Sequence, residues 1–259
     1  MSTVFAAPVD DRLGGLCCVG GVLWCLHKDK LFALDPATGK MLRTLAVQGK
    51  DIYVDLASDG KFLYLLPYGW TAGQGILKFD LKRGEWGPAL ETAANKSNKV
   101  YGARGIAVGG GSMFVASHLG IQKVNLDTGE AGAAMTVQLE GYRIVGVGGL
   151  DFNGAGLVGA ATIEKVKLGA DGKPLDNWYG LDKERPRLSV ILRIDPQTGM
   201  VKSFEPLNYP ANSLAYANGI FWLSEQPEMG FDRHNQPVRL YPKKMVIHRL
   251  DLRKAEAGM

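Results

Sequence analysis

The chain has 259 residues, of which 46% are hydrophobic and 22% charged, with 34 glycines and 12 prolines. No apolar run approaches the roughly 20 residues of a membrane-spanning helix, and the glycines lack the three-residue period of collagen. Thirty Lys and Arg against 26 Asp and Glu give a net charge of +4, which is too small to predict a nucleic-acid partner. We therefore expect a folded, turn-rich protein that binds neither nucleic acid nor membrane.

The first 25 residues give information on the cellular compartment in which the protein folds. The opening MSTVFAAP has strand character and lacks the basic start and apolar stretch of a secretory signal peptide. Cys17, Cys18 and Cys25 lie within nine residues of one another. An odd number of cysteines without scaffold spacing argues against a disulfide framework. We expect a cytoplasmic protein, with an extracytoplasmic location as the alternative if a signal peptide has been removed.

The main signal in the chain is internal repetition. A strand, a turn and a second strand recur five times. Each copy has an acidic or amide residue at the start of its turn, and these residues are Asp35, Asp80, Asn125, Asp195 and Asp251. They are spaced by 45, 45, 70 and 56 residues. A glycine-bearing hairpin with an aromatic second strand precedes each copy, as in GLCCVGGVLWCL and SLAYANGIFWLSE. Each unit thus contains four strands in about 45 residues, which is the size of a propeller blade.

These repeats predict an all-β single domain over residues 1–259, folded as a five-bladed β-propeller with four-stranded antiparallel blades. The predicted blades are about 12–50, 51–98, 101–140, 142–207, and 209–259 together with 1–10. The last unit lacks a convincing outer strand, whereas the opening segment has no other place in the repeat pattern. We therefore expect the N-terminal strand to complete the last blade and close the ring, leaving no open seam.

The repeats also resemble a known group of propellers. The segments on which the resemblance rests are VLWCLHKDKLFALDPATGK, VILRIDPQTGMVK, and GIFWLSEQ with IHRLDL. They are similar to the repeats of virginiamycin B lyase and of the YVTN and quinoprotein-like propellers, and the similarity covers nearly the whole chain. The resemblance implies a propeller whose relatives range from magnesium-dependent lyases to quinone-dependent dehydrogenases and binding proteins. Virginiamycin B lyase-like proteins have seven blades, whereas five is the number in glutaminyl cyclase-type and sugar-binding propellers.

The fourth and fifth units are enlarged at the same point, between their second and third strands. In a propeller, these loops lie on the face where ligands usually bind, so the two insertions predict a partial lid or side wall. Trp178 and Tyr179 in the first insertion are candidates for an aromatic wall, or alternatively pack the insertion onto its blade. His234 in the second insertion is a further candidate for ligand binding.

Polar residues gather on the same predicted face, at the mouth of the central channel. We expect His118 to act as a general base, because histidine titrates near neutrality, although a strand-capping role is the alternative. Glu225 is the second catalytic candidate, and with Asn212 it offers oxygen ligands for a divalent metal ion, the one cofactor that this set suggests. The candidates for substrate binding at the mouth are Tyr68, Trp70, Arg104, Tyr142, Arg143 and also Asn212.

Two further residues stand out in the strand alignment. Aligning the first strand of each unit places Asp151 where the other units have Cys17, Ala57, Ala107 and Ala215. A buried carboxylate needs a partner, and we expect either a structural pairing with an arginine such as Arg143 across the blade boundary or a local difference in strand register. His248, within VIHRLDL, is expected to pack or to face solvent.

Three functions fit this sequence. The first is an enzyme of lyase or hydrolase type that processes a small molecule at the channel mouth, with a divalent metal as a possible aid. The alternatives are a ligand-binding propeller without chemistry, lectin-like or sensor-like, and a protein-interaction scaffold. A GxSxG elbow, a P-loop and an HExxH motif are all missing from the sequence. The insertions on one face favour the enzyme.

Overall fold

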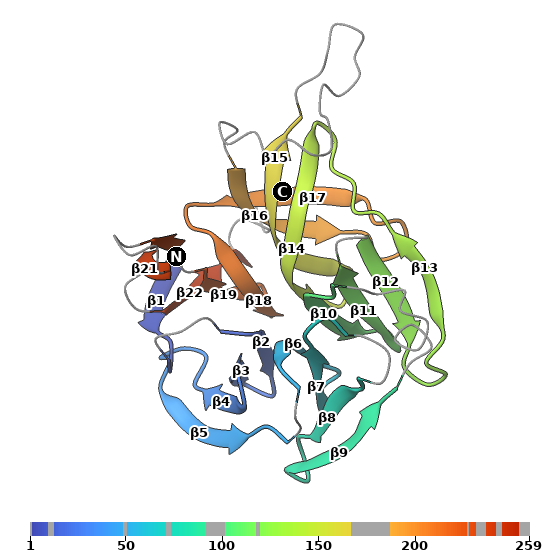
Figure 1. Cartoon of the computed structure of the whole chain (residues 1–259), viewed down its shortest axis with the longest axis vertical. Helices are drawn as coiled ribbons and strands as arrows, with labels where there is room; N and C mark the ends of the chain where they lie inside the picture. Colours follow the sequence, from blue (N-terminus) through green and yellow to red (C-terminus); the bar gives the residue numbers. More distant parts are fainter. Residues whose placement is uncertain are drawn as a thin grey trace, which may run out of the picture.

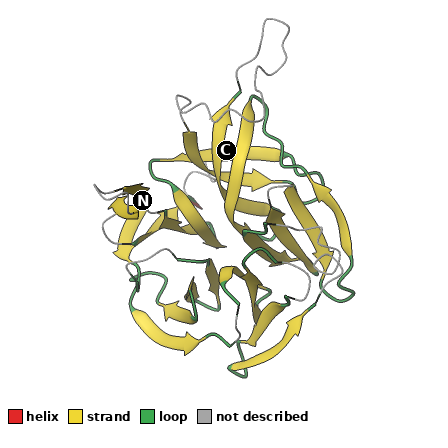
Figure 2. Cartoon of the chain, in the orientation of Figure 1, coloured by secondary structure: helices red, strands yellow, loops and turns green. Residues whose placement is uncertain are grey.

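The computed structural model describes residues 2–9, 13–48, 51–70, 74–91, 102–117, 120–166, 187–226, 228–231, 237–241 and 245–253. The chain is a five-bladed β-propeller, in which five four-stranded antiparallel sheets surround a common centre (Figure 1). Figure 2 shows the described residues as strands and loops only. No helix in this part of the chain is long and apolar enough to cross a membrane.

Four of the blades are formed by four consecutive strands each. Blade 1 contains β2 (Leu16–Val19), β3 (Val22–His27), β4 (Lys30–Leu34) and β5 (Met41–Ala46). Blade 2 contains β6 (Tyr53–Ser58), β7 (Phe62–Pro67), β8 (Ile76–Asp80) and β9 (Glu85–Leu90). Blade 3 contains β10 (Gly105–Gly109), β11 (Ser112–Ser117), β12 (Gly120–Asn125) and β13 (Ala131–Met135). Blade 4 contains β14 (Tyr142–Phe152), β15 (Leu157–Lys165), β16 (Arg187–Ile194) and β17 (Val201–Leu207).

Blade 5 joins the two ends of the chain, as the sequence predicted. Its strands are β18 (Ala211–Ala217), β19 (Ile220–Glu225), β22 (Val246–Asp251) and β1 (Ser2–Ala6), and their order across the sheet is β18, β19, β22, β1. The N-terminal strand pairs antiparallel with β22 from Ser2↔Leu250 to Ala6↔Val246. These backbone bonds close the ring and leave no seam between the last and first blades.

The two insertions differ in what can be described. Most of the first, including Trp178 and Tyr179, lies outside the described residues. The second forms a two-stranded hairpin of β20 (Glu228–Phe231) and β21 (Pro237–Tyr241). In Figure 1, β21 is seen at the outer side of blade 5, away from the common centre.

The repeated aspartate shapes the turn between the third and fourth strands. In blade 1 the Asp35 Oδ1 accepts hydrogen bonds from the backbone N–H groups of Ala37 (3.0 Å) and Thr38 (2.8 Å). The same pair of bonds recurs on Asp80, Asn125 and Asp195. The side chain thereby replaces a turn of backbone. Glycines serve turns throughout, since 15 of those in the described residues have positive φ.

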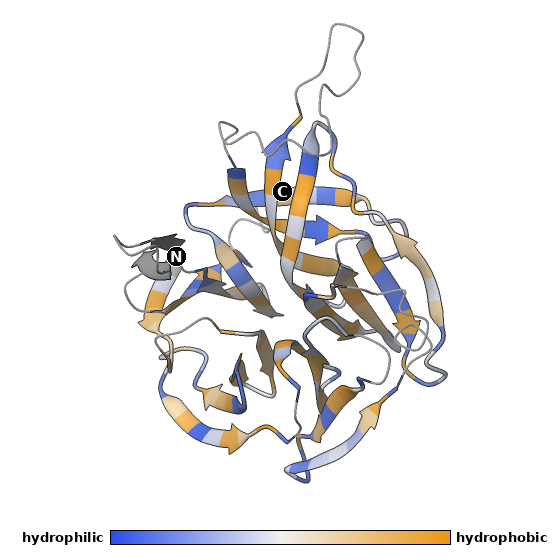
Figure 3. Cartoon of the chain, in the orientation of Figure 1, coloured by the Kyte–Doolittle hydropathy of each residue, from blue (hydrophilic) through white to orange (hydrophobic). Residues whose placement is uncertain are grey.

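The hydrophobic core is divided among the five interfaces between neighbouring blades. Hydrophobic residues recur along the strands of every blade in Figure 3. Buried side chains form five clusters, each of which takes members from two adjacent blades. At one aligned position the inner strands carry a small side chain in four blades and Asp151 in blade 4. The strand pairings confirm this alignment: Cys17↔Trp24, Ala57↔Tyr64, Ala107↔Phe114, Asp151↔Val158 and Ala215↔Trp222. Small inner residues permit close contact between sheets near the axis.

Candidate functional site

A pocket opens between blades 4 and 5 on the face that carries the blade-to-blade connections, and we refer to it as the mouth pocket. Its volume is about 760 Å³, within the range of small-molecule sites. It is lined by residues 145–148, 160–162 and 207–212 together with Arg104, Arg187, Ser189 and Gln226. Because Arg104 belongs to the start of blade 3, the pocket reaches from the cleft between blades 4 and 5 toward the channel mouth.

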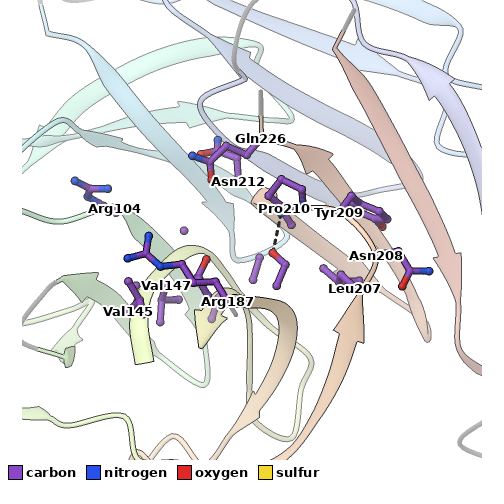
Figure 4. Close-up of a pocket in the computed structure, with 17 residues that line it drawn as sticks. Arg104, Val145, Val147, Arg187, Leu207, Asn208, Tyr209, Pro210, Asn212 and Gln226 are labelled. Carbon is purple, nitrogen blue, oxygen red and sulfur yellow. Dashed lines mark hydrogen bonds between the residues drawn. The ribbon is translucent and has the colours of Figure 1, made fainter. Parts of the chain in front are cut away.

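The pocket is polar at the side that carries its arginines. In Figure 4, Arg104 and Arg187 lie toward one side, whereas Asn208 and Tyr209 lie toward the other. The connection between the blades is fixed by a bond from the Ala211 N–H to the Ser189 hydroxyl (3.2 Å). The lining offers guanidinium, amide, hydroxyl and phenol groups beside the apolar Val145, Val147 and Pro210.

A buried glutamate holds Arg187 in place. The Glu164 side chain is 3% exposed and lies at the end of β15. Its Oε1 accepts a hydrogen bond from Arg187 Nε (2.8 Å), and its Oε2 accepts one from Arg143 Nη2. These two arginines hold the pKa of Glu164 below its usual value, even though burial alone would raise it. This bond occupies the Arg187 Nε–H, and among the described residues no partner is bound to the Nη groups, which are donors for a ligand.

Arg104 and Asn212, both expected in the site, do line the pocket. Arg104 is exposed, and among the described residues no hydrogen bond or ion pair holds its guanidinium. Asn212 is 5% exposed, and its Nδ2 donates to the Leu13 carbonyl at 2.8 Å. That bond ties the start of blade 5 to the start of blade 1, so Asn212 has a structural role in addition to lining the pocket.

Glu225 lies behind the pocket wall. It is 1% exposed, and its Oε2 lies 2.8 Å from His248 Nε2. The His248 ring stacks on the Tyr209 ring, with centroids 3.6 Å apart and planes inclined by 12°. Tyr209 lines the mouth pocket, whereas Glu225 and His248 are not among its lining residues. His248, which the sequence placed in a packing or solvent-facing role, is therefore the polar partner of a predicted catalytic residue.

Several residues that the sequence predicted to bind substrate lie away from the mouth pocket. Tyr68 is 61% exposed, and Trp70 is 1% exposed within the cluster between blades 2 and 3. Tyr142 packs edge-on against Phe204 with ring centroids 5.6 Å apart. None of these three lines the mouth pocket. His118, His234, Trp178 and Tyr179 lie outside the described residues, so their roles stay predictions.

The expected pairing of Asp151 with Arg143 is wrong. Arg143 is bound to Glu164, whereas Asp151 accepts backbone N–H bonds from Phe152 and, across the blade boundary, from Tyr216 (both 2.7 Å). Burial raises the pKa of Asp151 to about 7, although these backbone bonds act in the opposite direction. The carboxylate thus joins blades 4 and 5 through the main chain.

A metal site is not evident in the part of the chain that the structure describes. No group of three or more His, Cys, Asp or Glu side chains is placed there to hold an ion. Glu225 is engaged with His248, and the Asn212 side chain with Leu13. The divalent ion therefore stays a prediction.

Fold and pocket together define a class of protein: a five-bladed β-propeller with a small-molecule-sized pocket on its mouth face. No family model and no curated protein matches the chain. Among solved structures, Myxococcus xanthus glutaminyl cyclase is similar with a TM-score of 0.61 at 15% identity, over 96% of this chain and 94% of that one. Kuenenia stuttgartiensis hydrazine synthase gives a TM-score of 0.44 at 14% identity, over 94% of this chain and 64% of that one. The first likeness shows the fold alone.

Sequence reasoning missed His248, although a signal for it was present. Counting back from the turn aspartate, the other third strands have Phe32, Leu77, Gln122 and Leu192 at the equivalent position. An imidazole in a position that elsewhere holds apolar side chains or an amide implies a specific polar partner. Arg187 carried no comparable signal, because its importance depends on Glu164, 23 residues away in the chain.

Proposed function

We propose that the protein binds a small anionic molecule in the mouth pocket. The observation that carries this proposal is the pair of arginines at one side of the pocket, one of them oriented by a buried glutamate. Guanidinium groups recognise carboxylates and phosphates through paired N–H donors. Counting Arg104, Arg143 and Arg187 against Glu164, the local charge is net positive. The amides of Asn212 and Gln226 add hydrogen-bonding groups for the rest of the ligand.

The lining favours binding over acid–base chemistry. Its titratable side chains in the described residues are two arginines and Tyr209, whereas carboxylates and imidazoles are absent from it. A general base must lie within hydrogen-bond reach of the proton it removes, and neither Glu225 nor His248 is among the residues that line the pocket. Of the three functions considered from sequence, the ligand-binding propeller therefore has the stronger support.

Thermal shift with simple anions tests the proposal. Inorganic phosphate and citrate, added at matched ionic strength, should raise the melting temperature in a saturable manner, because a ligand that binds only the native state stabilises it. R104Q should abolish most of this shift without altering the unliganded protein, since the Arg104 side chain has no partner in the described residues.

R83Q is the matched control. Arg83 is an arginine of blade 2 whose side chain is 75% exposed, so its loss should leave the anion effect intact. The proposal fails if neither anion shifts the parent protein, or if R104Q and R83Q respond alike.

A second candidate is an enzyme of lyase or hydrolase type at the same mouth. It is supported by the similarity in fold to a glutaminyl cyclase and by the resemblance of the repeats to virginiamycin B lyase. A proton-transferring group would come from His118, which directly follows β11 in the chain, and a divalent ion would assist. An assay of glutaminyl cyclisation with and without a chelator, on parent and H118A, tests it. Turnover in the parent that H118A retains within a few-fold would exclude His118 as the base.

A further inference from the structure

At Tyr209 in the wall of the mouth pocket, and at the nearby Glu225, two buried polar atoms have no hydrogen-bond partner in the part of the chain that the structure describes. They are the Tyr209 hydroxyl oxygen and Glu225 Oε1. Glu225 is 1% exposed, and its other oxygen is taken by His248. Three separate parts of the blade meet here: the connection from blade 4, strand β19 and strand β22.

Leaving these atoms unpaired would be costly. A buried donor or acceptor without a partner lowers the stability of the fold by its full desolvation penalty, and native structures satisfy nearly all such groups. The two atoms do not bond to each other directly. They are held near each other by His248, whose ring stacks on the Tyr209 ring with centroids 3.6 Å apart and whose Nε2 lies 2.8 Å from the other Glu225 oxygen. Burial, and to a smaller extent the charge of Glu225, raises the pKa of Tyr209. A phenol that donates and a carboxylate oxygen that accepts are the two complementary ends of a water bridge.

We propose that an ordered, buried water molecule joins the Tyr209 hydroxyl to Glu225 Oε1 in the wall of the mouth pocket. The bridge completes a chain from His248 through Glu225 and the water to Tyr209. Buried water commonly satisfies polar groups in this manner, provided that at least two partners are within reach.

The chain connects the pocket to the closure of the ring. His248 lies on β22, opposite Val4 of the N-terminal strand, and it stacks on the ring of Tyr209. Tyr209 is thereby held from its face by His248 and from its hydroxyl by the water, which makes Glu225 and His248 positioning residues for the pocket wall. The inference does not depend on which ligand the pocket takes.

The first test is a high-resolution crystal structure of the full chain. It should show a water within about 2.7–3.2 Å of both the Tyr209 hydroxyl and Glu225 Oε1. A direct bond between the two side chains, or an empty, dry gap between them, would overturn the proposal.

The second test uses the sign of a stability change. If the hydroxyl is bridged, Y209F removes a hydrogen bond and should lower the melting temperature by roughly 2–4 °C. An unpaired hydroxyl predicts the opposite, since its removal would leave the melting temperature unchanged or raise it. Y142F is the matched control and should stay within about 1 °C, because Tyr142 has no buried unpaired hydroxyl.

A double variant provides the third test. If one water joins the two side chains, the losses caused by Y209F and E225Q should not add, because both changes act on the same water-mediated contact. A double variant that loses the full sum of the single effects would contradict the shared bridge. E225Q keeps the size of the side chain and an oxygen for His248, so the variant should remain folded.

Discussion

Phe5 is the side chain through which the N-terminal strand contributes to the core, and F5A should destabilise the closed ring. Phe5 lies opposite Ile247 in the β1–β22 ladder and packs, partly buried, against the cluster shared by blades 5 and 1. It also contacts the β4–β5 turn of blade 1, because a Cβ placed on Gly39 would lie only 2.4 Å from its ring. One side chain therefore bridges the point where the ring closes.

The expected loss follows from this partial burial. Replacing a fully buried phenylalanine by alanine costs about 3–5 kcal/mol. A residue buried about half as well should cost roughly 2 kcal/mol, which lowers the melting temperature of a domain of this size by about 4–8 °C. Val4 is the matched control, since it neighbours Phe5 on the same strand but is 51% exposed. V4A should change stability by about 0.5 kcal/mol or less.

Thermal melting and urea denaturation of F5A, V4A and the parent measure the effect. F5A should lower both the melting temperature and the urea midpoint, with the slope of the urea transition unchanged. A melting temperature of F5A within about 1 °C of the parent, or equal losses of stability in F5A and V4A, would refute the conclusion that Phe5 stabilises the closure of the ring by β1.

Two further predictions follow from the same structure. G39A and G84A place alanine in equivalent turns with φ of 72° and 71°, so both should lose about 1 kcal/mol. G39A should lose more, because its Cβ meets the Phe5 ring whereas that of G84A meets nothing; this excess should vanish in an F5A background, as melting curves would show. For Asp151, the native pKa of about 7 exceeds the unfolded value of ~3.9, so stability should fall as the pH rises between about 4 and 7, by at most about 1.4 kcal/mol per pH unit. Urea midpoints should be less dependent on pH in D151N than in the exposed control D127N, and equal slopes in the two would refute the assignment.

The blade repeats were predictable because their causes are local. The Asp35 turn depends on backbone groups two and three residues away, and the alternation within each strand has a period of two residues. Even the closure by β1 could be inferred, since a ring of sheets leaves one outer strand to be supplied by the other end of the chain. Such features recur in every unit and so reinforce one another.

The candidate site was predictable only in part. The face, Arg104 and Asn212 could be inferred from where strands begin and end. The role of Arg187 could not, because it depends on a glutamate 23 residues away. For His248 the sequence indicates a polar partner, but only the fold shows that this partner is Glu225. Asp151 shows the same limit: its aligned position was predicted, but its partner is a backbone N–H 65 residues along the chain, and an arginine was expected instead.

The sequence by itself determined the scaffold: 259 residues divided into five units of four strands, with the N-terminal segment completing the last. Only the tertiary structure decided which interface between blades opens into a pocket, and which side chains meet behind its wall. The physical reason is that turns and strand alternation are set by neighbours in sequence. A pocket depends instead on how separate sheets meet, and the non-repeating residues at that boundary give the mouth pocket its chemistry.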